Sequence, residues 1–247
     1  MGARAVLRWV GVCAAVLAAC ALVACHSTTQ LPPAAPDATR QVGWEDTPLP
    51  TKRPTRYMPT SLEGRAVIQA DADNAVSLYR RRVHVEPSEL GRLSFSWMVP
   101  ELIAKADLSR SESEDAPVRI VLAFDGDISK LSFKNRMLFD LLEAVAGEAP
   151  PYATLMYVWD NRAPLESVIT AGRTDRIRKI VVDSGPTQKA IWRLHERDIA
   201  SDYRRAFGEE PGALTSIALM TDSDNTRSTT RAYYGEVRLV GARGQLQ

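Results

Sequence analysis

The chain has 247 residues and a mass of 27.2 kDa, and its 45% hydrophobic and 25% charged residues are typical of a globular protein. Lys and Arg number 31 against 30 Asp and Glu, a balance that argues against nucleic acid as a partner. The three cysteines, Cys13, Cys20 and Cys25, all lie in one N-terminal apolar segment. The sequence after that segment therefore excludes a disulfide, a zinc–thiolate site and a cysteine nucleophile.

Residues 1–24 have the layout of a secretory signal peptide, with two arginines before an apolar run of 15 residues, Trp9 to Val23. Leu22-Val23-Ala24-Cys25 resembles the lipobox of bacterial lipoproteins, in which cleavage precedes the cysteine and its thiol carries a diacylglycerol. We therefore expect Cys25 to be the lipidated first residue of the mature chain. Cleavage before Cys20 is the weaker alternative, because it leaves an apolar stump. An uncleaved transmembrane anchor would need about 20 apolar residues.

Residues 25–60 are predicted to be the acylated cysteine and an extended tether. Residues 26–60 contain seven of the 15 prolines and few large apolar side chains, so this segment cannot bury enough surface to fold. The lipid would hold the protein on a membrane. His26, where some bacterial lipoproteins have an aspartate for inner-membrane retention, favours the outer membrane, facing the periplasm. Residues 61–247 then form a single domain.

Apolar and polar residues alternate from Ser61 onward, as in strands that bury one face. Leu93, Phe95, Trp97 and Val99 give one such pattern. Similar stretches are found at 66–70, 75–85, 118–124, 152–159, 177–183, 190–194, 213–221 and 230–240. About nine strands predict an all-β fold, an antiparallel β-sandwich of jelly-roll-like type.

Two short helices interrupt this pattern. Apolar residues at i, i+3, i+4 and i+7 predict one helix around Leu138 to Val145, with Gly147 at its C-terminus. A second helix is predicted from Ile199 to Phe207, behind an Asp198 N-cap and ended by Gly208. Helices do not recur between successive strands, so a parallel βαβ sheet is not expected.

Sequence motifs of familiar catalytic mechanisms are absent. The sequence contains no GxSxG, GxGxxG, GxxxxGK or HExxH. Ser223-Asp224-Asn225 matches the SDN triplet of penicillin-recognising enzymes, but the SxxK and KTG motifs of those enzymes are missing. We interpret His84 and His195 as solvated or salt-bridged side chains. The sequence therefore indicates no catalytic residue and no organic cofactor.

Asp222, Asp224 and Asn225 lie within four positions in a predicted turn and offer the oxygen ligands that calcium prefers. They lack the glycine turn and the distal glutamate of an EF-hand loop. Asp and Asn side chains also stabilise turns by hydrogen bonding to backbone amides. Turn formation is the favoured interpretation, and a calcium site is the alternative.

Trp159 has the strongest local case for ligand contact among the aromatic residues, because Asp160 and Asn161 follow it at a predicted strand end. A sugar ring can stack on an exposed indole while carboxylate and amide groups bond its hydroxyls. Core packing is the favoured interpretation of the tryptophan, and ligand contact is the alternative. The candidate ligand contacts are Trp159, Asp160, Asn161, Asp222, Asp224 and Asn225.

Four sequence motifs resemble, in the same order, those of the bacterial family catalogued as domain of unknown function 3047. They are Ser94-Phe95-Ser96-Trp97, the segment Tyr152 to Asn161, the segment Asp202 to Gly208, and Met220-Thr221-Asp222-Ser223-Asp224-Asn225-Thr226. The resemblance runs from Gly64 to Val240. It implies an exported, single-domain, β-rich protein and supplies no established reaction and no catalytic residues.

Three classes of function remain open. The favoured one is a non-catalytic, lipid-anchored β-sandwich that binds an extracytoplasmic ligand such as an envelope carbohydrate. The second is an envelope polysaccharide hydrolase or lyase that uses two carboxylates, whose separation in space decides the mechanism. The third is an envelope scaffold that meets a protein partner through a sheet edge or through the helix at Leu138 to Val145.

Overall fold

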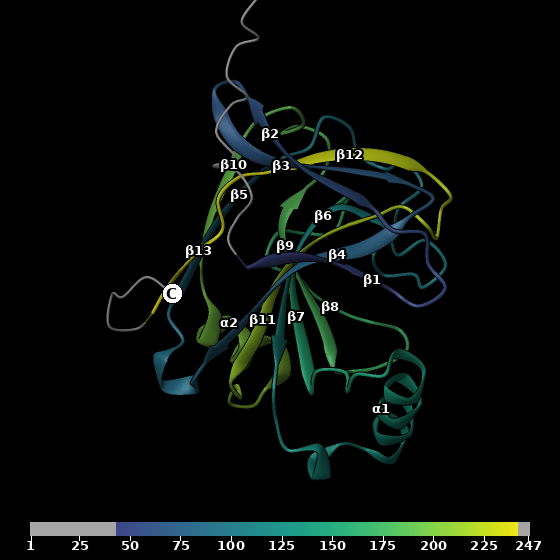
Figure 1. The fold of residues 1–247 in the computed structure, drawn as a ribbon, viewed down its shortest axis with the longest axis vertical. Helices are drawn as coiled ribbons and strands as arrows, with labels where there is room; N and C mark the ends of the chain where they lie inside the picture. Colours follow the sequence, from purple (N-terminus) through teal and green to yellow (C-terminus); the bar gives the residue numbers. More distant parts are fainter. Residues whose placement is uncertain (1–42, 242–247) are drawn as a thin grey trace, which may run out of the picture. The chain divides into compact units, whose positions relative to one another are not determined.

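The computed structural model describes residues 43–241, which form two β-sheets and two α-helices (Figure 1). The seven-stranded sheet contains, in spatial order, β1 (Trp44–Pro48), β4 (Val76–Val85), β11 (Leu214–Asp222), β6 (Ala116–Phe124), β7 (Ala153–Asp160), β9 (Ile177–Ser184) and β8 (Val168–Thr170). The six-stranded sheet contains β10 (Arg193–Asp198), β5 (Arg92–Met98), β12 (Thr229–Tyr234), β3 (Arg65–Asp73) and β2 (Arg56–Leu62), with β13 (Arg238–Val240) paired to β5. The predicted signal peptide and the predicted lipidation site at Cys25 lie outside the described residues.

The predicted all-β sandwich is confirmed, since the two sheets enclose one main hydrophobic core. Phe95 of one sheet stacks on Tyr157 of the other, with 5.5 Å between the ring centroids, and both side chains are fully buried. Trp97 is also fully buried, as the alternation of β5 predicts. Every strand pair in residues 43–241 is antiparallel except β7 with β9, where the chain crosses over through β8.

The folded region begins earlier than the predicted tether allows, because β1 and β2 belong to the two sheets. Trp44 is buried and stacks on Tyr79, which stacks in turn on Tyr57. Both strands lie at a sheet edge, so each has a hydrogen-bonded neighbour on one side only, and a proline, which lacks an N–H, can be accommodated there. Pro48 and Pro59 are therefore compatible with these strands. The high proline content of the segment is the reason why the strands were not predicted.

The two predicted helices are present as α1 (Phe133–Ala146) and α2 (Ile199–Phe207). The carboxylate of Asp198 accepts a hydrogen bond from the Ser201 N–H and so caps α2 as predicted. Gly147 and Gly208 end the helices with φ angles of 70° and 73°, a left-handed conformation that glycine adopts without strain. None of the helices within residues 43–241 has the length and apolar character needed to cross a membrane.

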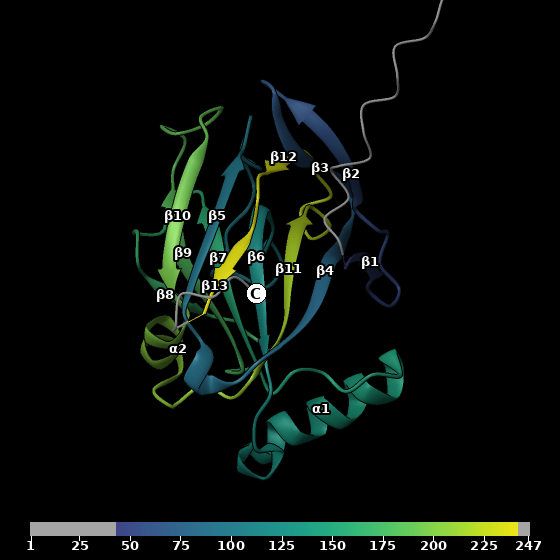
Figure 2. The same cartoon turned by 60° about the vertical axis from the view of Figure 1, so that its left-hand side comes forward.

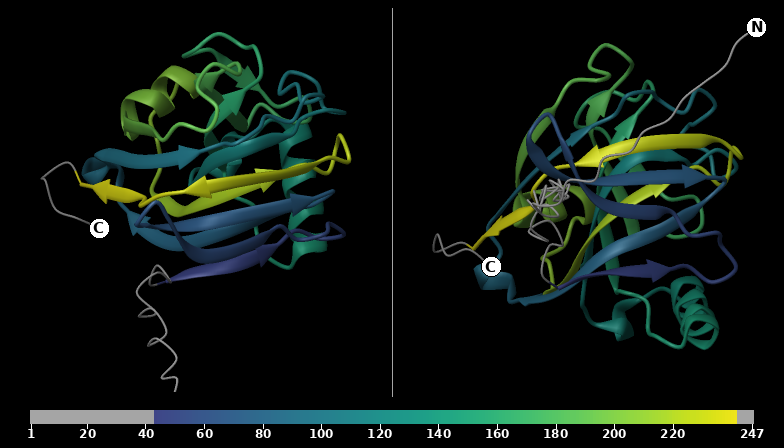
Figure 3. Two further views of the ribbon diagram at one scale, coloured as in Figure 1. Left: turned by 90° about the horizontal axis from the view of Figure 1, so that it is seen from above. Right: turned by 45° about the horizontal axis from the view of Figure 1, so that its top comes forward.

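The helices occupy different parts of the sandwich. α2 lies against β9 and β10 and buries Ile199 and Tyr203 in the main core (Figure 3). α1 lies in the connection between β6 and β7, at one end of the seven-stranded sheet (Figure 2). Asn135 and Phe139 are its only buried residues.

The outer face of the seven-stranded sheet carries a second apolar cluster. β7 is buried along its whole length because the connection between β5 and β6 covers its outer side while the sandwich core covers the other. The fully or nearly buried members of this cluster are Val76, Leu108, Ala116, Val121, Met156, Val158, Val181, Ala218 and Met220. Part of this face is left open, and the candidate site lies there.

Candidate functional site

A polar groove of about 270 Å³ is open on the outer face of the seven-stranded sheet. Its floor is Met156 of β7 and Met220 of β11, and its walls come from strand ends and loops on both sides. The polar groove is lined by Leu49, Lys52, Val76, Ser111, Glu114, Arg119, Met156, Ala171, Arg173, Thr174, Ile177, Met220, Asp222, Asp224 and Asn225.

Strand register brings the charged groups of the polar groove together. Arg119 of β6 pairs with Met220 of β11, and Asp222 follows two residues later on the same face. The Arg119 guanidinium forms a salt bridge with the Asp222 carboxylate at 3.0 Å and donates a hydrogen bond to the Glu114 carbonyl at 2.6 Å. Because Arg119 is only 2% exposed, this ion pair is shielded from water.

A second buried cation lies behind the groove wall. Lys179 of β9 is completely buried, and its ammonium group donates to the Glu114 carboxylate at 2.7 Å and to the Leu108 carbonyl at 3.2 Å. Burial lowers the pKa of Lys179, and the nearby positive charge of Arg119 lowers it further. The Glu114 carboxylate opposes both effects by stabilising the ammonium form.

Three carboxylates meet at the end of β11. Oxygen atoms of Asp115, Asp222 and Asp224 lie within 4.8 Å of one another. Burial raises the pKa of Asp222 to about 8, with Arg119 opposing the shift and the two other aspartates adding to it. The raised pKa reflects burial and the repulsion within the trio, which the salt bridge to Arg119 offsets only in part.

The contacts of the trio favour the turn interpretation over the calcium site. Asp115 accepts hydrogen bonds from the N–H groups of Asn225 at 3.1 Å and Thr226 at 2.8 Å. Asp224 forms a salt bridge with Lys52. Three carboxylates match the ligand type of a calcium ion, but arginine, lysine and backbone N–H groups already compensate their charge. We therefore assign no cation to them.

Trp159 and Asp160 do not reach the polar groove, and their assignment as ligand contacts is corrected here. Trp159 is 1% exposed, so it presents no ring face to a ligand, and its indole N–H donates to the Gly185 carbonyl at 3.0 Å. The Asp160 carboxylate accepts the N–H groups of Arg162 at 2.8 Å and Ala163 at 2.6 Å. Both side chains stabilise the connections around the end of β7.

Asn161 also has a structural position. Its side-chain amide donates to the carbonyls of Ile103 at 2.8 Å and Ala106 at 3.0 Å. It thus fixes the loop between β5 and β6 that covers the outer face of the sheet. The physical reason for all three corrections is that β7 is a central strand covered on both faces.

The two histidines of the described region each lie against a carboxylate. His84 is exposed and lies 2.9 Å from the Glu86 carboxylate. His195 is partly buried and lies 2.8 Å from the Asp183 carboxylate, which also accepts the Trp97 indole N–H at 2.7 Å. Burial alone would raise the pKa of Asp183, but the hydrogen bonds from His195 and Trp97 hold it below its ordinary value.

Sequence reasoning missed Arg119, Lys179, Glu114 and Asp115. Arg119 lies in the apolar stretch Val118 to Phe124, and Lys179 lies between Ile177 and Ile180. A long cationic side chain inside a strand that is buried on both faces requires a buried anionic or carbonyl partner. The positions of Arg119 and Lys179 in apolar strands therefore did indicate buried polar contacts. The partners themselves come from the loop before β6 and were not identifiable from spacing.

A larger groove of about 830 Å³ lies beside β3 and β12. Its charged side chains mostly pair with one another, since Asp71 bonds Arg56 at 3.0 Å and Arg231 at 2.5 Å, and Asp73 meets Arg53 at 3.0 Å. Those pairs are largely solvated. The polar groove differs in combining buried charges with an apolar floor.

Fold and groove together define a β-sandwich with a polar groove on the outer face of one sheet. The chain belongs to the family described as protein of unknown function (DUF3047), whose family model matches residues 42–238, and the resemblance seen in the sequence is thereby confirmed. No curated protein matches the chain.

One solved structure to which the chain is similar is the xyloglucanase domain of NopAA, a type three effector from Sinorhizobium fredii, in complex with cellobiose. The two share 10% sequence identity and align with a TM-score of 0.44, over 80% of this chain and 92% of that one.

Proposed function

We propose that the protein is a lipid-anchored β-sandwich of the cell envelope that binds a carbohydrate in the polar groove without transforming it. The observation that carries this proposal is the groove itself, in which hydrogen-bonding side chains surround a floor of two methionines. Ligand sites commonly combine an apolar surface with a few fixed polar groups in this way.

The groove suits a polyhydroxylated ring. Met156 and Met220 offer an apolar surface for the C–H face of a sugar. Asn225 and Asp224 offer acceptors for hydroxyl groups, and the exposed Arg173 offers donors. A volume of about 270 Å³ is close to the lower end of ligand pockets, roughly 300 Å³, so we expect one or two sugar units to be enclosed.

Membrane attachment forms the second part of the proposal and rests on the lipobox at Cys25. Cleavage before this cysteine and acylation would place the domain at a membrane, and we propose the periplasmic face of the outer membrane. Several acyl chains give stable anchoring, so the folded domain need not contribute to it.

The test is a glycan array followed by calorimetric titration with residues 43–247, which contain the whole core. Arg173→Ala should weaken binding of the best glycan about tenfold or more, because a hydrogen bond from a charged group is worth about 1.5–3 kcal/mol. Arg92→Ala is the matched control, since Arg92 lies on β5 and pairs only with the exposed Glu196 among the described residues. Absence of glycan binding by the wild type, with and without calcium, would refute the proposal.

One observation favours a second candidate, an envelope polysaccharide hydrolase or lyase. Asp222 and Asp224 both line the groove, and the pKa of Asp222 is raised to about 8, in the range of a general acid at neutral pH. Their separation lies below the roughly 5–9.5 Å of glycosidase pairs, and Asp222 is only 4% exposed, so binding is the better-supported role. Release of reducing ends from envelope polysaccharide by the wild type, lost in Asp224→Asn, would establish the enzyme instead.

A further inference from the structure

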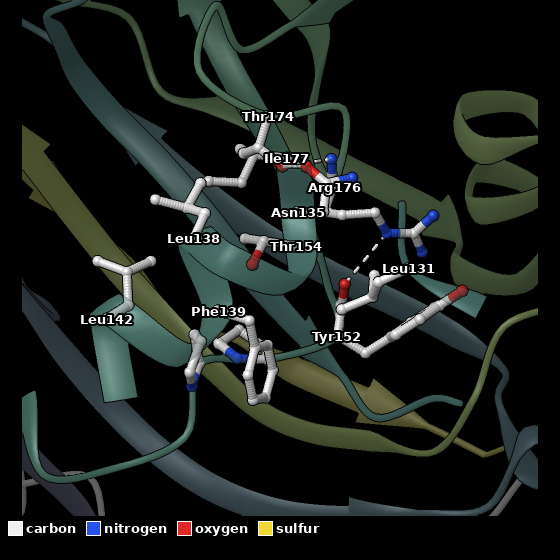
Figure 4. Close-up of a pocket in the computed structure, with 12 residues that line it drawn as sticks. Leu131, Asn135, Leu138, Phe139, Leu142, Tyr152, Thr154, Thr174, Arg176 and Ile177 are labelled. Atoms are coloured by element: carbon white, nitrogen blue, oxygen red, sulfur yellow. Dashed lines mark hydrogen bonds between the residues drawn. The ribbon is translucent and has the colours of Figure 1, made fainter. Parts of the chain in front are cut away.

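An apolar crevice separates α1 from the seven-stranded sheet (Figure 4). It has a volume of about 80 Å³ and adjoins the starts of β7 and β9. Its principal apolar lining consists of Leu131, Leu138, Phe139, Leu142, Tyr152 and Ile177. This hollow, the α1 crevice, offers little hydrogen bonding and suits a hydrocarbon group.

The α1 crevice and the polar groove adjoin each other, because Thr174 and Ile177 line both hollows. The polar groove contains the charged residues together with Met156 and Met220, whereas the crevice is lined mostly by apolar side chains. The outer face of the sheet therefore presents two neighbouring hollows, one polar and one apolar.

Few contacts hold α1 over its crevice. Asn135 donates to the Asp175 carboxylate at 2.5 Å and accepts the Thr174 hydroxyl at 3.0 Å, and Phe139 is the only other buried residue of the helix. Outward movement of α1 would break little packing. The volume of the crevice, about 80 Å³, is smaller than the roughly 150 Å³ of a cavity that binds a benzene ring. Binding of a hydrocarbon chain therefore requires the crevice to widen, which outward movement of α1 would allow.

We propose that the two hollows together bind an amphiphile, with a sugar headgroup in the polar groove and one alkyl or acyl chain in the α1 crevice. The headgroup part rests on the proposed carbohydrate-binding function. The alkyl-chain part rests on the apolar lining of the crevice and on its position next to the groove, with which it shares Thr174 and Ile177. A glycolipid has this chemistry, as a polyhydroxylated head joined to an unbranched hydrocarbon.

The experiment measures affinity against chain length. Maltose and hexyl, octyl and decyl β-maltoside, each below its critical micelle concentration, are titrated calorimetrically into residues 43–247. Each methylene that enters the crevice should tighten binding about fourfold, so affinity should rise steeply along the series until the crevice is full. Affinity that is independent of chain length would overturn the inference.

Adjacent leucines of α1 provide a matched pair of variants. Leu142 lines the crevice and is 44% exposed, whereas Leu141 does not line it and is 60% exposed. Leu142→Gln should flatten the dependence on chain length, and Leu141→Gln should preserve it. Equal loss in both variants would show that the chain binds the outer side of α1, which would overturn the inference and favour a membrane or protein contact there. Thermal unfolding of both variants checks that the fold is retained.

Failure of the headgroup proposal gives a different result. If Arg173→Ala changes none of the affinities while Leu142→Gln still flattens the series, the polar groove is not the carbohydrate site, and the proposed function fails but the chain site stands. If Arg173→Ala weakens every maltoside equally and chain length has no effect, the carbohydrate function stands and the amphiphile inference fails.

Discussion

Trp97 is the position at which the sandwich core is tested most directly. Its side chain is fully buried between the sheets, with ring centroids 5.0 Å from Phe95 and 5.2 Å from His195. Truncation of a buried aromatic residue to alanine costs about 3–5 kcal/mol. Trp97→Ala also removes the indole N–H that donates to the buried Asp183 carboxylate at 2.7 Å, and a hydrogen bond to a charged group is worth about 1.5–3 kcal/mol, although His195 and Arg193 still contact this carboxylate. We expect a total loss of at least about 4 kcal/mol, a large part of the roughly 5–15 kcal/mol by which domains are stable.

Urea unfolding followed by circular dichroism measures this loss, and Trp97→Phe separates its two sources. Phenylalanine keeps most of the ring volume but lacks the N–H donor, so this variant should lose only about 1–3 kcal/mol. An unchanged unfolding midpoint for Trp97→Ala would refute the placement of Trp97 in the core. Equal losses in both variants would show that the hydrogen bond to Asp183, rather than packing, dominates.

The remaining predictions concern the groove, the covering loop and the anchor. The pKa of Asp222, about 8 in the folded state against 3.8 for a free side chain, means that its contribution to stability is complete below about pH 4 and is lost as the pH rises through 8. The stability of the wild type should therefore decline between these pH values, and Asp222→Asn should not show this decline. The melting temperature of the wild type should be equal in calcium and in chelator. A calcium-dependent rise that disappears in Asp222→Asn would support the metal site instead. Asn161→Ala should cost about 1–2 kcal/mol and speed proteolysis between Ile103 and Ala106, because two hydrogen bonds to this loop are lost. Cys25→Ser should abolish incorporation of labelled palmitate, and continued labelling would identify another cysteine as the acceptor.

Strands with one solvated face were predictable from sequence. β5 keeps strict alternation because Phe95 and Trp97 face the core while Ser94 and Ser96 face outward, and the sequence pattern locates it within one residue. The predicted strand 230–240 is instead divided into β12 and β13, with Gly235 donating its N–H to the Ser96 carbonyl at 2.9 Å between them. Short edge strands such as β8 carry no pattern long enough to detect.

Half of the candidate site was predictable. The turn at 222–225 was identified correctly as a cluster of oxygen-bearing side chains, because a strand end followed by Asp and Asn is a local signal. Trp159 was predicted as a ligand contact for the same reason, namely that Asp and Asn follow it at a strand end, and this prediction was wrong because Trp159 is buried. A strand end lies at the surface only if nothing covers it, and the loop anchored by Asn161 covers this one. That information is tertiary and cannot be obtained from spacing.

The buried charges beneath the polar groove are hard to explain by stability alone. Two cations, Arg119 and Lys179, are removed from water, and a buried ion pair is often no more stable than apolar side chains of similar volume. Among the described residues, the buried Nε of Arg119 has no hydrogen-bond partner. The surrounding cluster of Met156, Val121 and Ala218 would accommodate apolar replacements. Polar groups in such a position fix the geometry of Asp222 and of the turn that follows it, because the salt bridge to Arg119 holds the Asp222 carboxylate in one orientation.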